Sequence, residues 1–273
     1  MNVATLPAWL VPTLLGAAGL LVGGLIHLVV ERLPHQMERA WWADIAAELG
    51  DPLSWARALG TERPAACAHV GADIAAALAR TANGPATGSA TARRLAAALA
   101  TGGLFVAAAW RFGPVPSLAA WCLALALLVA LALIDLDTHL LPDALTLPLL
   151  WTGLIAATLH WTIPLPTAVW GAVAGFLALW MFAVPFRWAT GREGMAPGDF
   201  KLLAALGAWL GWQAILPIAL IACVAGAIVG LASRATGRRD PGEPIPFGPF
   251  LAAGGVVTML AGVDRVLKWA GLG

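Results

Sequence analysis

The sequence predicts an all-α, polytopic integral membrane protein, and its composition carries that prediction. Apolar residues make up 60% of the 273-residue chain, charged residues only 11%, and mean hydropathy is +0.82. Soluble domains carry roughly 25% charged residues. The near-neutral net charge of +1 also argues against a nucleic-acid-binding surface. The expected environment of the chain is therefore a lipid bilayer.

Apolar stretches long enough to cross a bilayer recur along the chain. A transmembrane helix needs about 20 mostly apolar residues. We expect about eight such spans, near residues 8–30, 95–112, 116–135, 144–162, 165–185, 200–213, 214–232 and 248–270. The first stretch lacks both a preceding basic segment and a small-residue cleavage site, which indicates a retained helix rather than a signal peptide.

Basic residues set the expected orientation, because cytoplasmic connections carry an excess of Lys and Arg. Arginines are frequent in residues 31–94, and they also precede the sixth span and follow the seventh. Those last two connections must then share a side, so the chain crosses twice between residues 200 and 232. Eight spans with both termini outside fit this pattern.

Residues 31–94 form the only sizeable soluble segment and are expected to be a cytoplasmic loop domain. The run ERLPHQMERAWWADIAAEL interleaves charges with apolar residues and is typical of a surface helix. The later run TANGPATGSATARR predicts a flexible linker. The remaining division is a first span over residues 1–30 and a membrane-embedded core over residues 95–273.

Cysteines and histidines lack the spacing of a metal site. Cys67, Cys122 and Cys223 are scattered singly, so neither a disulfide framework nor a zinc site is expected. Cys122 and Cys223 lie within apolar runs and are interpreted as small core residues. His27 is expected to be packed and His139 to be interfacial.

Two acidic residues, Asp135 and Asp199, lie at the ends of long apolar runs. A charge at membrane depth costs from a few to more than about 10 kcal/mol, so such a carboxylate usually performs chemistry, carries ions or binds a partner. The simpler alternatives are a helix N-cap for Asp199 and a helix end in the headgroup region for Asp135. The second alternative is weaker, because the helix dipole disfavours an acid at a C-terminus.

Four segments carry a resemblance to a known family. They read, in order, GLLVGGLIHLVVERLP, LIDLDTHLLPDALTLPLLWTGLI, EGMAPGDFKLLAALGAWLGWQ and PIPFGPFLAAGG. Together they resemble the type IV prepilin peptidase family (prepilin leader peptidase/N-methyltransferase), membrane aspartic peptidases of the GxGD type. The resemblance implies that Asp135 and Asp199 are the catalytic pair. It also implies type IV prepilin or type II secretion pseudopilin substrates, and a bacterial inner membrane enzyme with its active site at the cytoplasmic face.

The chemistry of an aspartic pair fits this assignment. One carboxylate activates water while one carboxylic acid polarises the substrate carbonyl, so the two groups share a proton. Asp199 opens a helix and is expected to be mainly ionised, whereas Asp135 closes one and is expected to be mainly protonated.

Neighbouring residues are expected to support the site: Gly198, Lys201, Asp137 and Asp143. Gly198 keeps the Gly-Asp core of the family motif. Lys201 either pairs with a catalytic carboxylate or the substrate, or anchors its helix at the cytoplasmic face. Asp137 either supports the pair or is solvated. Asp143, which follows Pro142, is expected to be the N-cap of the fourth span.

The chain departs from the family pattern at three places. Its first loop holds only Cys67 where family members often carry two CxxC pairs, so no zinc is expected. Use of S-adenosylmethionine for N-methylation of the new amino terminus stays open for the same reason. Ala196-Pro197 replaces a usual glycine and its neighbour, which stiffens that loop. Gly24 and His27 replace small hydroxyl and amide residues in the first span.

Two other classes of function remain. A transporter would use Asp135 and Asp199 for protons or cations, but it would place them near the midplane and show internal symmetry. An inactive scaffold for pilus assembly is favoured only by Ala196-Pro197. For the predicted enzyme, cleavage is expected to need no metal, because the aspartic pair supplies both acid and base. Its expected partners are a pilin-like precursor and the bilayer. The sequence does not indicate an oligomeric state.

Overall fold

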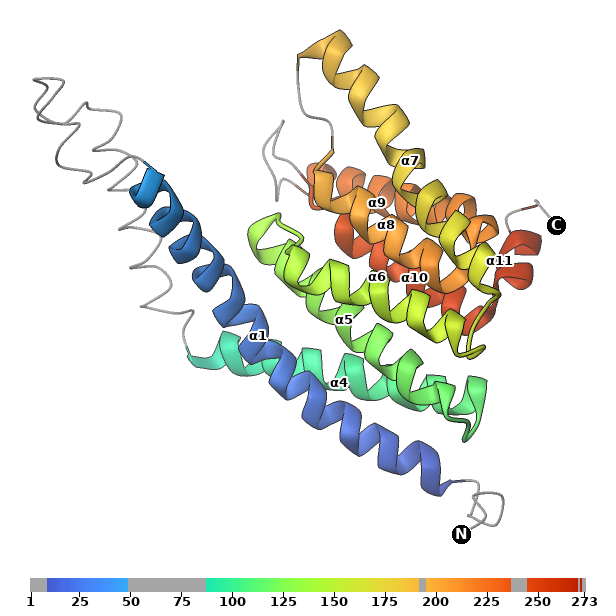
Figure 1. Cartoon of the computed structure of the whole chain (residues 1–273). Helices are drawn as coiled ribbons and strands as arrows, with labels where there is room; N and C mark the ends of the chain where they lie inside the picture. The colour runs from blue at the N-terminus through green and yellow to red at the C-terminus, as the bar shows by residue number, and fades with distance from the viewer. Residues whose placement is uncertain (1–8, 49–86, 192–194, 237–244, 270, 272–273) are drawn as a thin grey trace, which may run out of the picture.

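The computed structural model describes residues 9–48, 87–191, 195–236, 245–269 and 271 (Figure 1). In these ranges the regular structure is helical, so the predicted all-α class is confirmed. The elements in order are α1 (Leu10–Glu48), α4 (Thr87–Phe112), α5 (Ser117–Thr138), α6 (Asp143–Thr158), α7 (Leu165–Thr190), α8 (Pro197–Leu210), the 3-10 turn η2 (Trp212–Ala214), α9 (Ile215–Ala235), α10 (Gly248–Ala261) and α11 (Val263–Trp269).

Proline and glycine mark where several helices begin and end. Pro197 is the first residue of α8, and Pro249 is the second residue of α10. Proline suits these positions, because its fixed φ is helical and its missing N–H would have no partner in the helix. At the other ends, α7, α8 and α10 stop at glycines with positive φ, namely Gly191, Gly211 and Gly262. Glycine adopts this conformation without the strain that a side chain would cause.

The apolar helices make the chain a multi-pass membrane protein. In the described residues, five segments are long and apolar enough to cross a bilayer: Leu10–Pro34, Thr91–Phe112, Ser117–Thr138, Leu165–Thr190 and Trp212–Ala235. Helices α10 and α11 make a sixth if they count as one span, although they are bent by 112° at Gly262. The expected count of eight spans is not confirmed, because α6 and α8 have only 16 and 14 residues.

Two boundaries differ from the expected ones. Helix α1 runs without a break from the first span to Glu48, so the expected surface helix is a continuation of that span. Helix α4 begins at Thr87, inside the expected linker. The alanines of this stretch favour a helix, and Arg93 and Arg94 form ion pairs with α5 and α1. Residues 49–86, which include Cys67, lie outside the described residues.

Helix α8 lies at the centre of the core (Figure 1). From Asp199 to Leu210 every residue except Lys201 is buried. Helices α6, α7 and α10 contact α8. The apolar composition of α8 therefore reflects burial inside the protein as much as any contact with lipid.

Close glycine contacts hold α7 and α8 together. A Cβ atom on Gly171 of α7 would lie 2.1 Å from the carbonyl oxygen of Gly207 in α8. Only glycine allows two helix backbones to approach this closely. On another side of α8, the indole Nε1–H of Trp209 donates to the carbonyl oxygen of Leu149 in α6 at 2.9 Å. These contacts fix the position of the helix that carries Asp199.

Three smaller predictions have different outcomes. His27 is 8% exposed, which confirms that it is packed. Cys122 is buried as expected. Cys223 is exposed, so the prediction that it is a core residue is wrong. Its apolar run belongs to α9, a candidate span with much of its surface on the outside of the helical core, where apolar side chains also occur.

Candidate active site

The two predicted catalytic residues come together at one end of the core. Asp135 lies in the last turn of α5 and Asp199 in the first turn of α8. Each is only 4% exposed. The two carboxyl groups are close enough to interact electrostatically. Two acids that are 64 positions apart in the sequence thus occupy one buried site.

The side chain of Asp135 faces a second helix. Its own helix ends where His139, at φ 55°, donates its N–H to the carbonyl oxygen of Asp135 at 2.9 Å. The carboxylate Oδ2 accepts a hydrogen bond of 2.9 Å from the N–H of Gly248, the first residue of α10. The backbone of Asp135 therefore belongs to a helix C-terminus, while its carboxylate lies at a helix N-terminus.

Asp199 is the third residue of α8 and not its N-cap. The N-cap is Ala196, and Pro197 is the first helical residue. The extended conformation of Ala196, φ −73° and ψ 143°, is the one favoured before proline. Ala196-Pro197 thus begins the helix and places Asp199 in its first turn. The simpler interpretation of Asp199 as a helix N-cap is wrong.

Leu141 packs against the two glycines next to the acids. A Cβ atom on Gly198 would lie 2.7 Å from the Leu141 Cβ. A Cβ atom on Gly248 would lie 3.1 Å from the Leu141 Cδ1 and 2.6 Å from the Asp135 Oδ2. Neither position accepts a side chain without displacing a neighbour. Glycine at both places lets α8, α10 and the α5–α6 connection close around the carboxyl groups.

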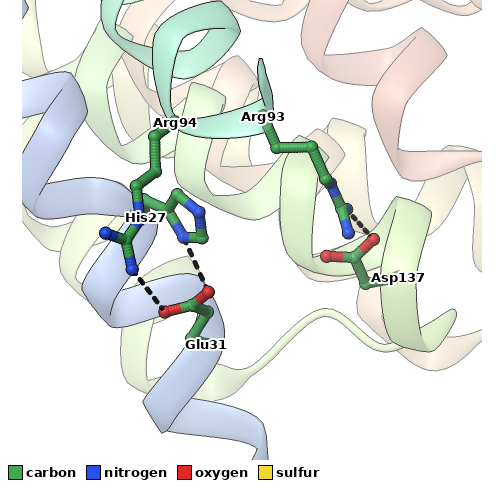
Figure 2. Close-up of polar contacts among 5 residues, drawn as sticks. All are labelled: His27, Glu31, Arg93, Arg94 and Asp137. Atoms are coloured by element: carbon green, nitrogen blue, oxygen red, sulfur yellow. Dashed lines mark hydrogen bonds and ion pairs between the residues drawn. The ribbon is translucent and has the colours of Figure 1, made fainter. Parts of the chain in front are cut away.

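Asp137 faces away from the buried pair. Its carboxylate accepts a hydrogen bond from the guanidinium of Arg93 on α4, as Figure 2 shows. The side chains of this ion pair are 51% exposed for Arg93 and 30% exposed for Asp137. The two alternatives for Asp137 were support of the pair and solvation. The structure gives it a third role, a bridge from α5 to α4.

A second ionic cluster joins α1 to α4 beside this bridge (Figure 2). The Glu31 carboxylate of α1 lies 3.6 Å from the Arg94 Nη2 and 3.4 Å from the His27 Nδ1. With the Arg93–Asp137 bridge, these contacts tie three helices together near the end of α5. Basic residues predicted only as loop charges therefore have specific acidic partners.

Lys201 and Asp143 form an ion pair with each other. The Lys201 Nζ donates to both carboxylate oxygens of Asp143, at 2.6 and 2.7 Å. Asp143 is the first residue of α6, and the N-cap position belongs to Pro142. The prediction that Asp143 caps the helix is therefore wrong, because its carboxylate turns to α8. Lys201 therefore pairs with Asp143 rather than with a catalytic carboxylate, and it does more than anchor its helix at the membrane face.

The described residues contain no group of three or more His, Cys, Asp or Glu side chains placed to hold a metal ion. Cys67 is outside those ranges. The predictions about zinc and S-adenosylmethionine therefore stay predictions.

Sequence reasoning missed Gly248 and Leu141. The segment PIPFGPFLAAGG contributed to the family resemblance, but no role was predicted for Gly248 within it. A signal was present, because Gly248 stands directly before Pro249 at the start of an apolar run, and Pro249 has no N–H to offer. Leu141 gave no signal, since an apolar residue in a connection is common.

The arrangement is suited to acid–base chemistry. In the described residues neither Asp135 nor Asp199 forms an ion pair, while Asp137 and Asp143 each do. Two carboxyl groups that share a buried site cannot both ionise easily, so the favoured state holds one proton between them. Such a pair offers a base and an acid at one place.

Comparisons with known proteins agree with this chemistry. Residues 122–231 match the model of the type IV leader peptidase family. A prepilin leader peptidase/N-methyltransferase of Burkholderia pseudomallei (strain K96243) is 44% identical, with 93% of this chain and 86% of the relative covered. The enzyme of the same name from Pseudomonas aeruginosa is 41% identical, with 92% of this chain and 90% of the relative covered. The one from Pectobacterium carotovorum is 39% identical, with 93% of this chain and 94% of the relative covered.

No solved structure matches the chain significantly. The family model covers both aspartates, most of α5 and all of α8. The identity to the curated relatives extends over nearly the whole chain. The chain therefore belongs to the type IV leader peptidase family.

Proposed function

We propose that this protein is a membrane aspartic endopeptidase that removes the leader peptide from type IV prepilins or type II secretion pseudopilins. The observation that carries the proposal is the buried pair of Asp135 and Asp199 at one end of the core. The curated relatives are named for prepilin leader cleavage. The comparisons give no support to a transporter.

The two carboxyl groups supply all the proton transfers that peptide hydrolysis needs. The ionised carboxylate takes a proton from water as the water oxygen adds to the carbonyl carbon of the scissile bond. The protonated partner donates to the carbonyl oxygen, which becomes part of a tetrahedral intermediate. As the C–N bond breaks, the leaving nitrogen takes up a proton from the pair. The products are the leader with a carboxyl terminus and the pilin with a free amine.

The proposed site lies at the cytoplasmic face of the bacterial inner membrane. Arg93 and Arg94 lie near the end of α5 that carries Asp135, and basic residues favour the cytoplasmic side. A precursor with a basic leader and one apolar helix would span the bilayer with its leader in the cytoplasm. Its cleavage point would then lie at the depth of the aspartate pair.

The proposal assigns a role to each segment of the chain. Residues 95–273 form the peptidase core, preceded by a first span over residues 1–30 and a loop domain over residues 31–94. The relatives' shared name includes N-methyltransferase. Residues 31–94 would carry any such activity with S-adenosylmethionine, and we expect weak or absent transfer because the loop holds a single cysteine.

One experiment tests both activities. The purified protein in lipid is incubated with a pilin precursor, with and without S-adenosylmethionine, and the mass of the product's amino terminus is measured. We expect loss of the leader in both samples. An intact precursor after incubation with folded enzyme would contradict the peptidase. A product heavier by one methylene in the second sample would contradict the prediction on methylation.

A further inference from the structure

We propose that Gly248 is a positioning residue for the peptidase: its backbone N–H holds the Asp135 carboxylate in the ionised form, which makes Asp135 the base of the catalytic pair and Asp199 the acid. This inference rests on the proposed function and deepens it. It depends on the hydrogen bonding at the start of α10, on the space around Gly248, and on the charged groups near Asp135.

The first residues of α10 leave one N–H group for Asp135. The first N–H groups of any helix have no acceptor within that helix. In α10, Pro249 has no N–H, and the N–H groups of Phe250 and Leu251 both donate to the carbonyl oxygen of Phe247 at 3.1 Å. The N–H of Gly248 donates instead to the Asp135 Oδ2 at 2.9 Å, in a buried contact. The carboxylate thereby satisfies the donor that α10 leaves open.

The position accepts only glycine because of Asp135 itself. A Cβ atom at residue 248 would lie 2.6 Å from the Asp135 Oδ2 and 3.1 Å from its Cγ. Gly248 is not among the glycines with positive φ, so its backbone conformation suits other residues too. An alanine would therefore fit the helix but push the carboxylate away from the N–H group.

This contact reverses the roles expected from the helix ends. That expectation placed Asp135 at the C-terminus of α5, where a neutral acid is favoured, and Asp199 at the N-terminus of α8, where an anion is favoured. The N–H group and the positive end of α10 both favour an anion at the Asp135 carboxylate. Asp199 also lies in the first turn of a helix and accepts a backbone hydrogen bond from Ala196, but its burial and the neighbouring Asp135 together raise its pKa to about 7. The shared proton then resides mainly on Asp199, which donates it to the substrate carbonyl.

The other charged groups near Asp135 leave this assignment intact. Asp199 on α8 and His139 at the end of α5 act on Asp135 electrostatically. Arg93 of α4 is engaged by Asp137, the neighbour on α5. On the side of α6, the Asp143 carboxylate is held by Lys201. The direct donor to the Asp135 carboxylate is the N–H of Gly248.

The test compares Gly248→Ala with Gly226→Ala in purified full-length enzyme. Gly226 lies in α9, and a Cβ atom there would meet Phe250 at an ordinary 3.4 Å. We expect Gly248→Ala to lower kcat by roughly 100-fold, the loss typical of a misplaced catalytic group, with little change in KM. Because the anion loses its donor, the acid limb of the kcat profile should move to higher pH. Gly226→Ala should change neither.

Melting temperature shows whether the variant is folded. If Gly248→Ala melts well below wild type, Leu141→Ala is added, since it relieves the second contact of the new methyl group, 3.1 Å from Leu141 Cδ1. The proposal expects kcat to stay low in the folded double variant, because the contact with Asp135 persists. Recovery to the kcat of Leu141→Ala alone would overturn it, as would wild-type kcat and pH profile in Gly248→Ala. Failure of the wild-type enzyme to cleave would instead count against the proposed function.

Discussion

Four aspartates near one end of the molecule fall into two contrasting pairs. Asp135 and Asp199 are buried and form no ion pair in the described structure, whereas Asp137 and Asp143 are exposed and each binds a basic side chain of a neighbouring helix. Asp135 and Asp137 are only two positions apart in the chain. Burial without a cationic partner, rather than sequence neighbourhood, therefore separates acids that can share a proton from acids that join helices.

The energetics of the two pairs differ in the same way. A solvent-exposed ion pair contributes about 0–1 kcal/mol to stability, and the Arg93 side chain is 51% exposed. A buried carboxylate costs several kcal/mol when it ionises without compensation. A fold keeps two such groups together at that cost where their chemistry is used.

The largest expected effect is on the buried pair. Asp135→Asn and Asp199→Asn should each lower the cleavage rate by roughly 1,000-fold or more, because an amide is neither base nor acid. The double variant should be about as inactive as each single variant, since residues that act as one unit are not additive. Cleavage of a pilin precursor is followed by gel or mass spectrometry, with membrane insertion and melting temperature as controls. More than a few per cent of wild-type activity in either single variant would contradict the pair.

A much smaller effect is expected at the Arg93–Asp137 bridge. Arg93→Gln or Asp137→Asn should lower cleavage by no more than about fivefold, which corresponds to the 1 kcal/mol upper range of an exposed pair. The double variant should be no worse than either single one, because both remove the same contact. Wild-type activity should also fall modestly with added salt. A 100-fold loss in Asp137→Asn would place Asp137 in the chemistry and remove the contrast.

The Lys201–Asp143 pair should matter less still for cleavage. Lys201→Gln and Asp143→Asn should change kcat by less than about twofold and cost about 0.2–1 kcal/mol in stability, because the pair is partly exposed. Melting temperature and kcat measured on the same samples separate the two effects. If Lys201→Gln removed cleavage while the protein stayed folded, Lys201 would act on substrate or on the catalytic carboxyl groups.

No effect is expected from removing metal ions. Strong chelators should leave the cleavage rate unchanged, because the aspartate pair supplies both acid and base. Elemental analysis of the purified protein provides an independent measurement. Stoichiometric zinc, together with loss of cleavage on chelation, would contradict a metal-free peptidase.

Sequence reasoning found the helical class, the family and the two buried aspartates, but its count of eight spans is not confirmed. The reason is visible in α8, which is apolar because nearly all of it is buried inside the protein. Hydropathy along a chain does not distinguish a residue that faces protein from one that faces lipid. Helices α6 and α8 were therefore counted as full spans although they have 16 and 14 residues.

The surroundings of the site were harder to predict than its acids. The hydrogen-bond donor to Asp135 comes from Gly248, which is 113 positions away. Helix-end rules applied to the helix of each aspartate by itself gave the opposite location for the shared proton. Asp143 looked like a cap for the same reason, since its partner Lys201 is 58 positions away. Local patterns describe a residue's own helix, whereas these roles depend on the helix packed against it.

The most direct test of the contrast is to find the shared proton by infrared difference spectroscopy. Spectra of the wild-type protein at neutral pH are compared with those of Asp199→Asn, Asp137→Asn and Asp143→Asn. We predict that the wild type holds a buried protonated carboxyl group whose band disappears in Asp199→Asn and stays in the other two variants. A wild-type protein without such a band, or a band that only Asp137→Asn or Asp143→Asn removes, would contradict the assignment of the proton to the buried pair.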